Sequence, residues 1–173
     1  MKNNILIAYF LQKGKTEETQ CQKVVGQLGE ALKAKGEEFS VFAITPTEEY
    51  PVERENFEMV TKIEKENRKR PELTSKYSGM KDVTHLLLVA PNWWNDLPMA
   101  VYSFLDQYDF AEKKIVPVVV HGGDGAEAIT ESFRNFLHKN WILPTVAVAD
   151  PAADAPEIAK AIDELFQPSV SKY

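Results

Sequence analysis

Three short stretches of the chain carry residues whose types and spacing could bind a ligand. Leu11 to Thr16 contains one glycine between two lysines and ends in a threonine, and Val89 to Met99 holds two adjacent tryptophans between two prolines. His121 to Gly125 has three glycines in five residues. A helix N-terminus and lysines can hold an anion, indoles can stack on a flat ring, and glycine lets a ligand approach the backbone. Together these stretches describe a site for a phosphorylated, planar aromatic molecule.

The tryptophan stretch lies on a short loop between a strand and a helix. The apolar run from Leu86 to Ala90 ends at Pro91, which cannot continue a sheet ladder. Pro98 suits the first turn of a helix, where a missing N–H costs nothing. Open α/β sheets bind ligands at the carboxyl ends of their strands, where this loop would lie. We therefore expect one of Trp93 and Trp94 to anchor the core and one to stack on a ligand.

The first stretch has the composition of an anion-binding turn. Gly14 permits a tight turn, Thr16 supplies a hydroxyl, and Lys13 and Lys15 supply positive charge. We expect a helix to begin at Thr16, so that its first backbone N–H groups face the anion. The alternative is a solvated turn that carries two surface lysines.

Apolar runs that alternate with helical periodicity must position these loops. Strands are predicted over 4–10, 39–44, 82–90, 114–120 and 144–149, and helices over about 16–36, 52–69, 99–107, 129–137 and 158–166. This alternation predicts an α/β fold with a three-layer, doubly wound, five-stranded parallel sheet in the order 2-1-3-4-5. Strands one, three and four are then neighbours, so the three loops converge on one rim. Pro117 is awkward within its strand, since strand prolines favour edges and bulges.

Length and composition exclude several other classes. We expect 173 residues to form a single domain over 1–173, located in the cytoplasm. The net charge of −6 argues against a nucleic-acid partner, and no apolar run is long enough to span a membrane. Cys21 is the only cysteine, so no internal disulfide or cysteine-based metal site is possible, and we expect it to pack in the core.

The whole chain resembles the flavodoxin-like family in its short form. The resemblance is carried by "ILIAYF" with the Gly-x-Thr turn after it, by "PNWWNDLPMAVYSFLDQYDF" and by "IVPVVVHGGDG". The family binds flavin mononucleotide (FMN): the first loop holds the phosphate, and the other two flank the isoalloxazine ring. By this resemblance the cofactor-binding residues are Gln12, Lys13, Gly14, Lys15, Thr16, Pro91, Asn92, Trp93, Trp94, Asn95, His121, Gly122, Gly123, Asp124 and Gly125.

The chain departs from the family pattern in two places. The phosphate loop of the family reads Ser/Thr-x-Thr-Gly-Asn-Thr, and only Gly14 and Thr16 of that motif are present here. We therefore expect a phosphate site that is weaker and more sensitive to salt. Asn95 stands where relatives often have glycine, and it should adopt a positive φ. Asp96 and Asp124 are predicted to flank the ring and to lower its reduction potential.

The resemblance implies an FMN-binding protein that transfers electrons to a redox partner protein or a small-molecule acceptor. No catalytic side chain and no metal is predicted. One alternative is an FMN-dependent NAD(P)H:quinone-type reductase, which would oxidise NADPH without a partner. The other alternative is a flavodoxin-fold binding module that has lost FMN, which would stay colourless when FMN is added.

Overall fold

The strands form one parallel sheet whose order confirms the predicted 2-1-3-4-5 topology. The computed structural model describes residues 2–120, 126–137, 141–143 and 145–167. The sheet order is β2-β1-β3-β4-β5, with a sixth strand that also pairs with β4. The strands are β1 (Ile5–Phe10), β2 (Phe39–Ile44), β3 (His85–Pro91), β4 (Lys114–Val120), β5 (Trp141–Ile142) and β6 (Val146–Val148).

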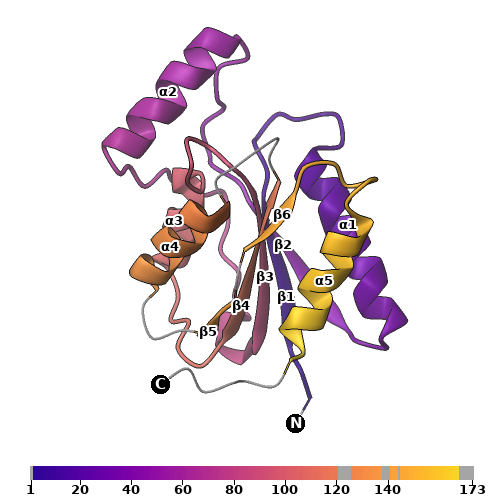
Figure 1. The fold of residues 1–173 in the computed structure, drawn as a ribbon. Helices are drawn as coiled ribbons and strands as arrows, with labels where there is room; N and C mark the ends of the chain where they lie inside the picture. Colours follow the sequence, from indigo (N-terminus) through magenta and orange to yellow (C-terminus); the bar gives the residue numbers. More distant parts are fainter. Residues whose placement is uncertain (1, 121–125, 138–140, 144, 168–173) are drawn as a thin grey trace.

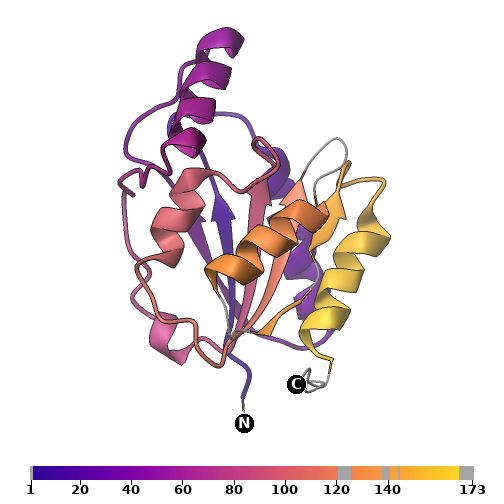
Figure 2. The same ribbon diagram turned by 60° about the vertical axis from the view of Figure 1, so that its left-hand side comes forward.

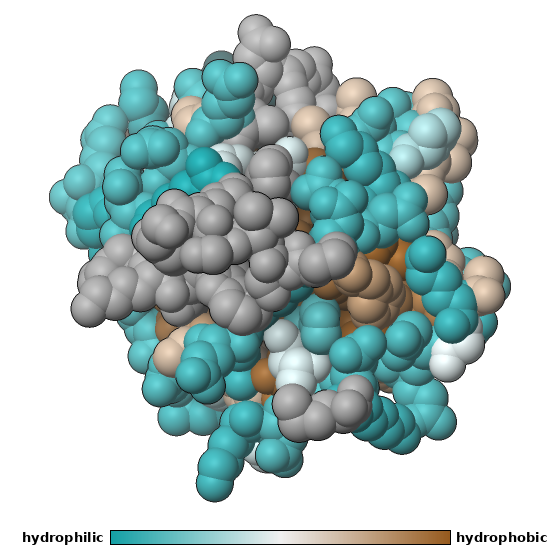
Figure 3. Space-filling model, turned by 60° about the horizontal axis from the view of Figure 1, so that its bottom comes forward, coloured by the Kyte–Doolittle hydropathy of each residue, from teal (hydrophilic) through white to brown (hydrophobic). Residues whose placement is uncertain are grey.

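Helices cover both faces of the sheet, as Figure 1 shows. One face carries α1 (Gln20–Ala34) and α5 (Ala155–Leu165), and the other carries α3 (Met99–Leu105) and α4 (Ala126–Phe136). The remaining helix, α2 (Arg54–Glu66), projects beyond the carboxyl ends of the strands (Figure 2). Figure 3 shows the molecule turned so that the lower end of the view in Figure 1 comes forward. The described part of this surface is mostly hydrophilic, and apolar residues are visible between the polar ones. Within the described residues, no helix has the length and apolarity needed to cross a membrane.

The central strands are apolar along their whole length because both of their faces are buried. Leu86 and Leu88 of β3 point into the core under α3 and α4, whereas Leu87 and Val89 point into the core under α1 and α5. This alternation follows from the period of two in a strand. It explains why β3 reads as a continuous apolar run, as expected for a strand in the middle of a parallel sheet.

The fifth position of the sheet is split into two short strands, where the sequence predicts one strand over 144–149. The partner β5 pairs with Lys114 and Ile115 of β4, and β6 pairs with 118–120. The interruption lies opposite Val116 and Pro117. Proline has no N–H to give to a ladder, so the residue that is awkward in the sequence coincides with the gap in the pairing.

The first helix begins later than predicted. Its N-cap is Thr19, whose hydroxyl accepts the N–H of Gln22 while the Gln22 side chain accepts the N–H of Thr19. This capping box fixes the start at Gln20, so the expectation of a helix from Thr16 is wrong. Gly36 follows the C-cap with a φ of 74°, as expected for a glycine that ends a helix. Cys21 packs in the core and is 6% exposed, and its burial raises the pKa of the thiol to about 12.

Candidate functional site

The two tryptophans lie on a tight turn that directly follows β3. We call residues Trp93 to Asp96 the tryptophan turn, because the backbone groups of its first and last residues bond to each other at 2.9 and 3.2 Å. Trp94 and Asn95 have φ values of 61° and 60°, the signature of a type I′ turn. The prediction for Asn95 is confirmed. The left-handed backbone conformation costs a bulky residue roughly 1–2 kcal/mol, so the backbone of Trp94 is strained.

Trp93 is the anchor of the pair. Its ring meets those of Phe10, Tyr50 and Phe57 edge to face, with centroids 5.0, 5.3 and 5.1 Å away. We call these four residues the aromatic cluster. Phe10 ends β1, Tyr50 precedes α2, and Phe57 lies on α2, so Trp93 ties together three separate segments. The contact with Phe10 also shows directly that the ends of β1 and β3 are neighbours on the rim.

Trp94 is the exposed member of the pair. The residue is 40% exposed, and its indole N–H donates to the hydroxyl of Thr61 at 3.0 Å. Its carbonyl accepts a hydrogen bond from Lys65, and the Lys62 ammonium lies 5.7 Å from the ring centroid. All three partners belong to α2, which therefore fixes the orientation of the ring.

Asp96 is buried and does not flank an open site as predicted. Only 4% exposed, its carboxylate accepts the N–H of Leu97 at 2.8 Å and the hydroxyl of Tyr102. Its second oxygen lies 3.3 Å from the guanidinium of Arg68. Burial is the main cause that raises the pKa of Tyr102, and the Asp96 carboxylate raises it further. The charge of Asp96 is therefore paired inside the protein, where it holds the turn instead of facing a ligand.

The loop after β1 is open. Residues 13–18 are all exposed, and Gly14 has a φ of 84°. Lys13 donates to the carbonyl of Thr47 at 3.2 Å, so its ammonium is drawn toward the segment after β2. Since α1 starts only at Gln20, an anion here would meet loop backbone before it met the helix. Gln12, Lys15 and Thr16 lie on the same loop.

Glu49 is a residue at this loop that sequence reasoning missed. Its carboxylate lies so close to Gly14 that a Cβ there would be 3.1 Å from its Oε1. A carboxylate beside the loop opposes a phosphate dianion by Coulomb repulsion. No motif marks Glu49, because it comes from the loop after β2, so only the fold brings it here.

A second carboxylate lies on the side of α2 that faces Tyr50. Glu64 accepts a hydrogen bond from the hydroxyl of Tyr50 at 3.1 Å, next to the aromatic cluster. Burial raises the pKa of Glu64, and the hydrogen bond from Tyr50 opposes that rise. Burial and the Glu64 charge raise the pKa of Tyr50 in turn. This pair adds a polar contact between α2 and the loop that follows β2.

The remaining predicted residues divide into two groups. Pro91 ends β3, and the N–H of Asn92 donates to the carbonyl of Val120 at 3.2 Å, which joins the ends of β3 and β4. The whole third loop, His121 to Gly125, lies outside the described residues. Among the described residues, no group of three or more potential metal ligands occurs. His85 lies at the opposite end of β3, and burial lowers its pKa.

These observations define a doubly wound α/β protein with its candidate site at the carboxyl rim of β1, β3 and β4. A family model described as flavodoxin matches residues 4–151. The chain therefore belongs to the flavodoxin family. A search of curated proteins finds no match.

Several solved structures share the fold. A protein from Bacteroides eggerthii assigned as a flavoprotein superposes with a TM-score of 0.76 at 18% identity, over 96% of this chain and 100% of that one. A flavoprotein from Lactobacillus acidophilus in complex with FMN superposes with a TM-score of 0.70 at 14% identity, over 96% of this chain and 100% of that one. An NAD(P)H:quinone oxidoreductase from Methanothermobacter marburgensis superposes with a TM-score of 0.60 at 14% identity, over 98% of this chain and 99% of that one. Family membership, with an FMN complex among the neighbours, supports FMN as the cofactor.

Proposed function

We propose that this protein binds FMN at the carboxyl rim and transfers electrons through it to a partner protein or a small-molecule acceptor. The observation that carries the proposal is the tryptophan turn, which holds an exposed indole in a strained conformation at the ends of adjacent central strands. Strained backbone of this kind persists only where its surroundings hold it, and it concentrates at functional sites. Membership of the flavodoxin family supports the same assignment.

The residues present suit such a ligand in two respects. The exposed indole of Trp94 offers a flat surface for the isoalloxazine ring, and its N–H is already satisfied by Thr61, so stacking costs no hydrogen bond. The exposed loop around Gly14 leaves backbone accessible to the phosphate. The carboxylate of Glu49 acts against the phosphate, so we expect a looser site than a full set of hydroxyl donors would give.

The flavin would supply the redox chemistry, and the chain would supply orientation and electrostatics. Trp93, fixed in the aromatic cluster, sets the position of the turn. Asp96 and Arg68 compensate each other's charge, so neither presents an unpaired charge to the ring. The chain thus binds and orients the flavin, and no described side chain is assigned a proton-transfer step.

The first experiment is a titration of the protein with FMN, followed by absorbance and flavin fluorescence. We expect uptake with strong quenching, and we expect Trp94→Ala to weaken binding by about 1–3 kcal/mol, by analogy with base–aromatic stacking. Val41→Ala, which truncates an exposed apolar side chain on β2, is the matched control and should leave affinity unchanged. A protein that takes up no FMN would contradict the proposal and favour the binding-module alternative.

The second experiment separates a carrier from a reductase. The FMN-loaded protein is mixed with NADPH and a quinone, and in parallel with a chemically reduced electron-carrier protein. If this protein is an electron carrier, it should accept electrons from the reduced carrier protein and should oxidise NADPH only slowly. Rapid quinone-dependent oxidation of NADPH by this protein alone would favour the reductase alternative instead.

A further inference from the structure

The tryptophan turn is bordered by positive charge, whereas the sequence predicts a negative charge there from Asp96. The ammonium of Lys62 lies over the ring of Trp94, 5.7 Å from its centroid, and the ammonium of Lys65 donates to the Trp94 carbonyl. Both lysines belong to the second half of α2. Two cations therefore contact the residue that we assign to stacking on the flavin.

Carboxylates that could cancel this charge are engaged elsewhere: Asp96 with Arg68, Glu58 with Arg54, and Glu64 with the Tyr50 hydroxyl. Glu66, one turn beyond Lys62, is exposed. Among the described residues, neither Lys62 nor Lys65 takes part in an ion pair. The two ammonium charges at the turn are therefore not cancelled by a carboxylate in contact with them.

The indole and these charges are held by the same helix. Thr61, which is 3% exposed, accepts the indole N–H of Trp94 at 3.0 Å and donates its own hydroxyl to the Phe57 carbonyl at 2.9 Å. Thr61 and both lysines lie within 61–65 of α2. The helix therefore sets the places of the two charges relative to the ring.

A flavin stacked on this indole would lie within reach of the charges on either side of the ring. Stacked rings are about 3.5–4 Å apart, so a flavin on the face away from Lys62 would lie roughly 10 Å from its ammonium. A flavin on the same face would move the ammonium aside to its own edge, which is closer still. The Debye length at physiological salt is about 8 Å, so a charge at such distances is partly screened and still felt.

We propose that Lys62 and Lys65 raise the reduction potential of FMN bound at the tryptophan turn, an inference that rests on the proposed function. When oxidised flavin takes up two electrons from a reduced carrier protein and one proton from water, its ring gains one negative charge. A nearby cation stabilises this more negative form and leaves the uncharged ring of the oxidised form almost unaffected. The sign of the effect is the opposite of the one that the sequence predicts from Asp96, whose charge is paired with Arg68.

The same charges make cofactor binding depend on the redox state. Because binding and reduction are linked, a cation that raises the potential also tightens the binding of reduced FMN more than that of oxidised FMN, by the same free energy. FMN bound at this turn is therefore a better electron acceptor than it would be without the two lysines, and it is held more firmly once reduced.

The test is a spectroelectrochemical titration of the FMN-loaded protein and of variants that lack one charge. Lys62→Gln and Lys65→Gln should each weaken the binding of reduced FMN about threefold more than that of oxidised FMN, which lowers the potential of a two-electron couple by about 15 mV. Glutamine at position 65 can still donate to the Trp94 carbonyl, so the charge is removed and the hydrogen bond is kept. The double variant should show about twice the shift, and added salt should reduce it.

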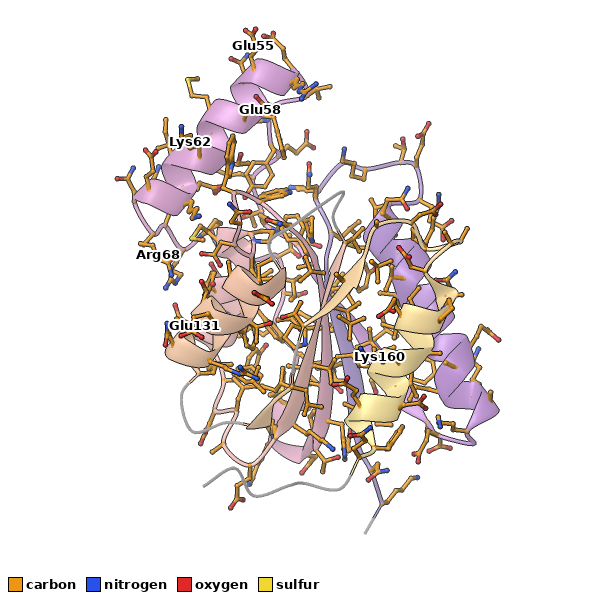
Figure 4. The ribbon with its side chains drawn as sticks, viewed as in Figure 1. Glu55, Glu58, Lys62, Arg68, Glu131 and Lys160 are labelled. Atoms are coloured by element: carbon orange, nitrogen blue, oxygen red, sulfur yellow. The ribbon has the colours of Figure 1, made fainter. Side chains whose placement is uncertain are left out.

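Two control variants separate the charge at the turn from other effects. Lys62→Arg keeps a positive charge beside the indole and should keep the wild-type potential. Lys160→Gln removes one positive charge from α5, well away from Lys62 (Figure 4), and should also leave the potential unchanged. A shift in Lys160→Gln as large as that in Lys62→Gln would reflect net charge alone and would overturn the proposal.

The outcomes distinguish this proposal from the proposed function. If the wild type and both glutamine variants take up FMN and share one potential, the proposed function stands and the role of the two lysines is refuted. If the wild type takes up no FMN, both the proposed function and this inference are wrong. Circular dichroism checks that each variant is folded.

Discussion

Two of the loops at the carboxyl rim, the tryptophan turn and the loop after β1, differ sharply in how they are held. The tryptophan turn is fixed by its own hydrogen bonds, by the aromatic cluster around Trp93 and by the buried Asp96. The loop after β1 is exposed over residues 13–18, and its notable neighbours are Glu49 and the carbonyl that Lys13 contacts. One region is rigid and strained, and the other is open and solvated.

This difference separates two parts of ligand recognition. A turn fixed before binding pays little ordering cost, so it suits the flat and invariant part of a ligand. An exposed loop holds an anion mainly through charge and backbone N–H groups, so its contribution falls with added salt. We therefore expect changes at Trp93 and Asp96 to alter stability, and changes at Trp94 and at the loop to alter affinity.

The largest effect is expected at the anchor of the rigid region. Trp93→Ala removes a ring that packs against three others and should lower the free energy of unfolding by about 3 kcal/mol. Urea denaturation measures this, with Trp94→Ala as the comparison. The exposed Trp94 should cost clearly less. Equal losses would mean that the two tryptophans share the structural role.

The next effect concerns the carboxylate that closes the turn. Asp96→Ala leaves the Tyr102 hydroxyl and the Arg68 guanidinium without their acceptor, and should cost about 2 kcal/mol. Asp106→Ala removes the exposed ion pair with Arg70 and should cost less than about 1 kcal/mol. Thermal and urea unfolding of both variants give the comparison. A smaller loss for Asp96 than for Asp106 would contradict its role in holding the turn.

A smaller effect is expected at the open loop. Glu49→Gln removes a negative charge beside Gly14 and should tighten FMN binding by about 1 kcal/mol, or roughly fivefold, at low salt. The gain should shrink as salt is added. Glu48→Gln removes the neighbouring exposed charge and serves as the control in the same titrations. The prediction fails if both variants change affinity equally.

The smallest effect is a dependence of the protein's stability on pH, which arises from Glu64 of α2. Because burial raises the pKa of Glu64 above its ordinary value of 4.5, the unfolded chain releases this proton first as the pH rises. Stability should therefore fall with rising pH through that value and above it. Glu64→Gln should remove this decline in urea denaturation from about pH 4 to about pH 7, whereas Tyr50→Phe should steepen it. A wild type that gains stability over this range relative to Glu64→Gln would refute the assignment.

The sequence predicted the doubly wound parallel sheet because the central strands are long apolar runs separated by clear helical periodicity, and the order 2-1-3-4-5 is a common order for that fold. It did not predict the split at the fifth position, since that gap depends on which residues of β4 each short strand meets. It placed the start of α1 too early, because Gly14 and Thr16 suggested a helix start while the Thr19–Gln22 capping box lies further along.

The sequence also located the tryptophan turn and predicted the positive φ of Asn95. It left open which indole is the anchor, because the answer depends on α2, more than 25 residues earlier in the chain. The burial of Asp96 was equally invisible, since its partners Arg68 and Tyr102 are brought to it only by the fold. Local patterns therefore placed the site on the rim, and long-range contacts decided what each side chain does there.

The buried thiol of Cys21 makes the molecule silent toward cysteine-directed reagents. A thiol with a pKa of about 12 is almost wholly protonated at neutral pH, and only the thiolate reacts quickly. Since the chain has no other cysteine, one introduced at Met59 or Asn95 would be the sole site of labelling. A spin label or fluorophore could thus be attached to α2 or to the tryptophan turn separately, without first removing the native cysteine. The signal of each label during ligand uptake would then show whether that element moves.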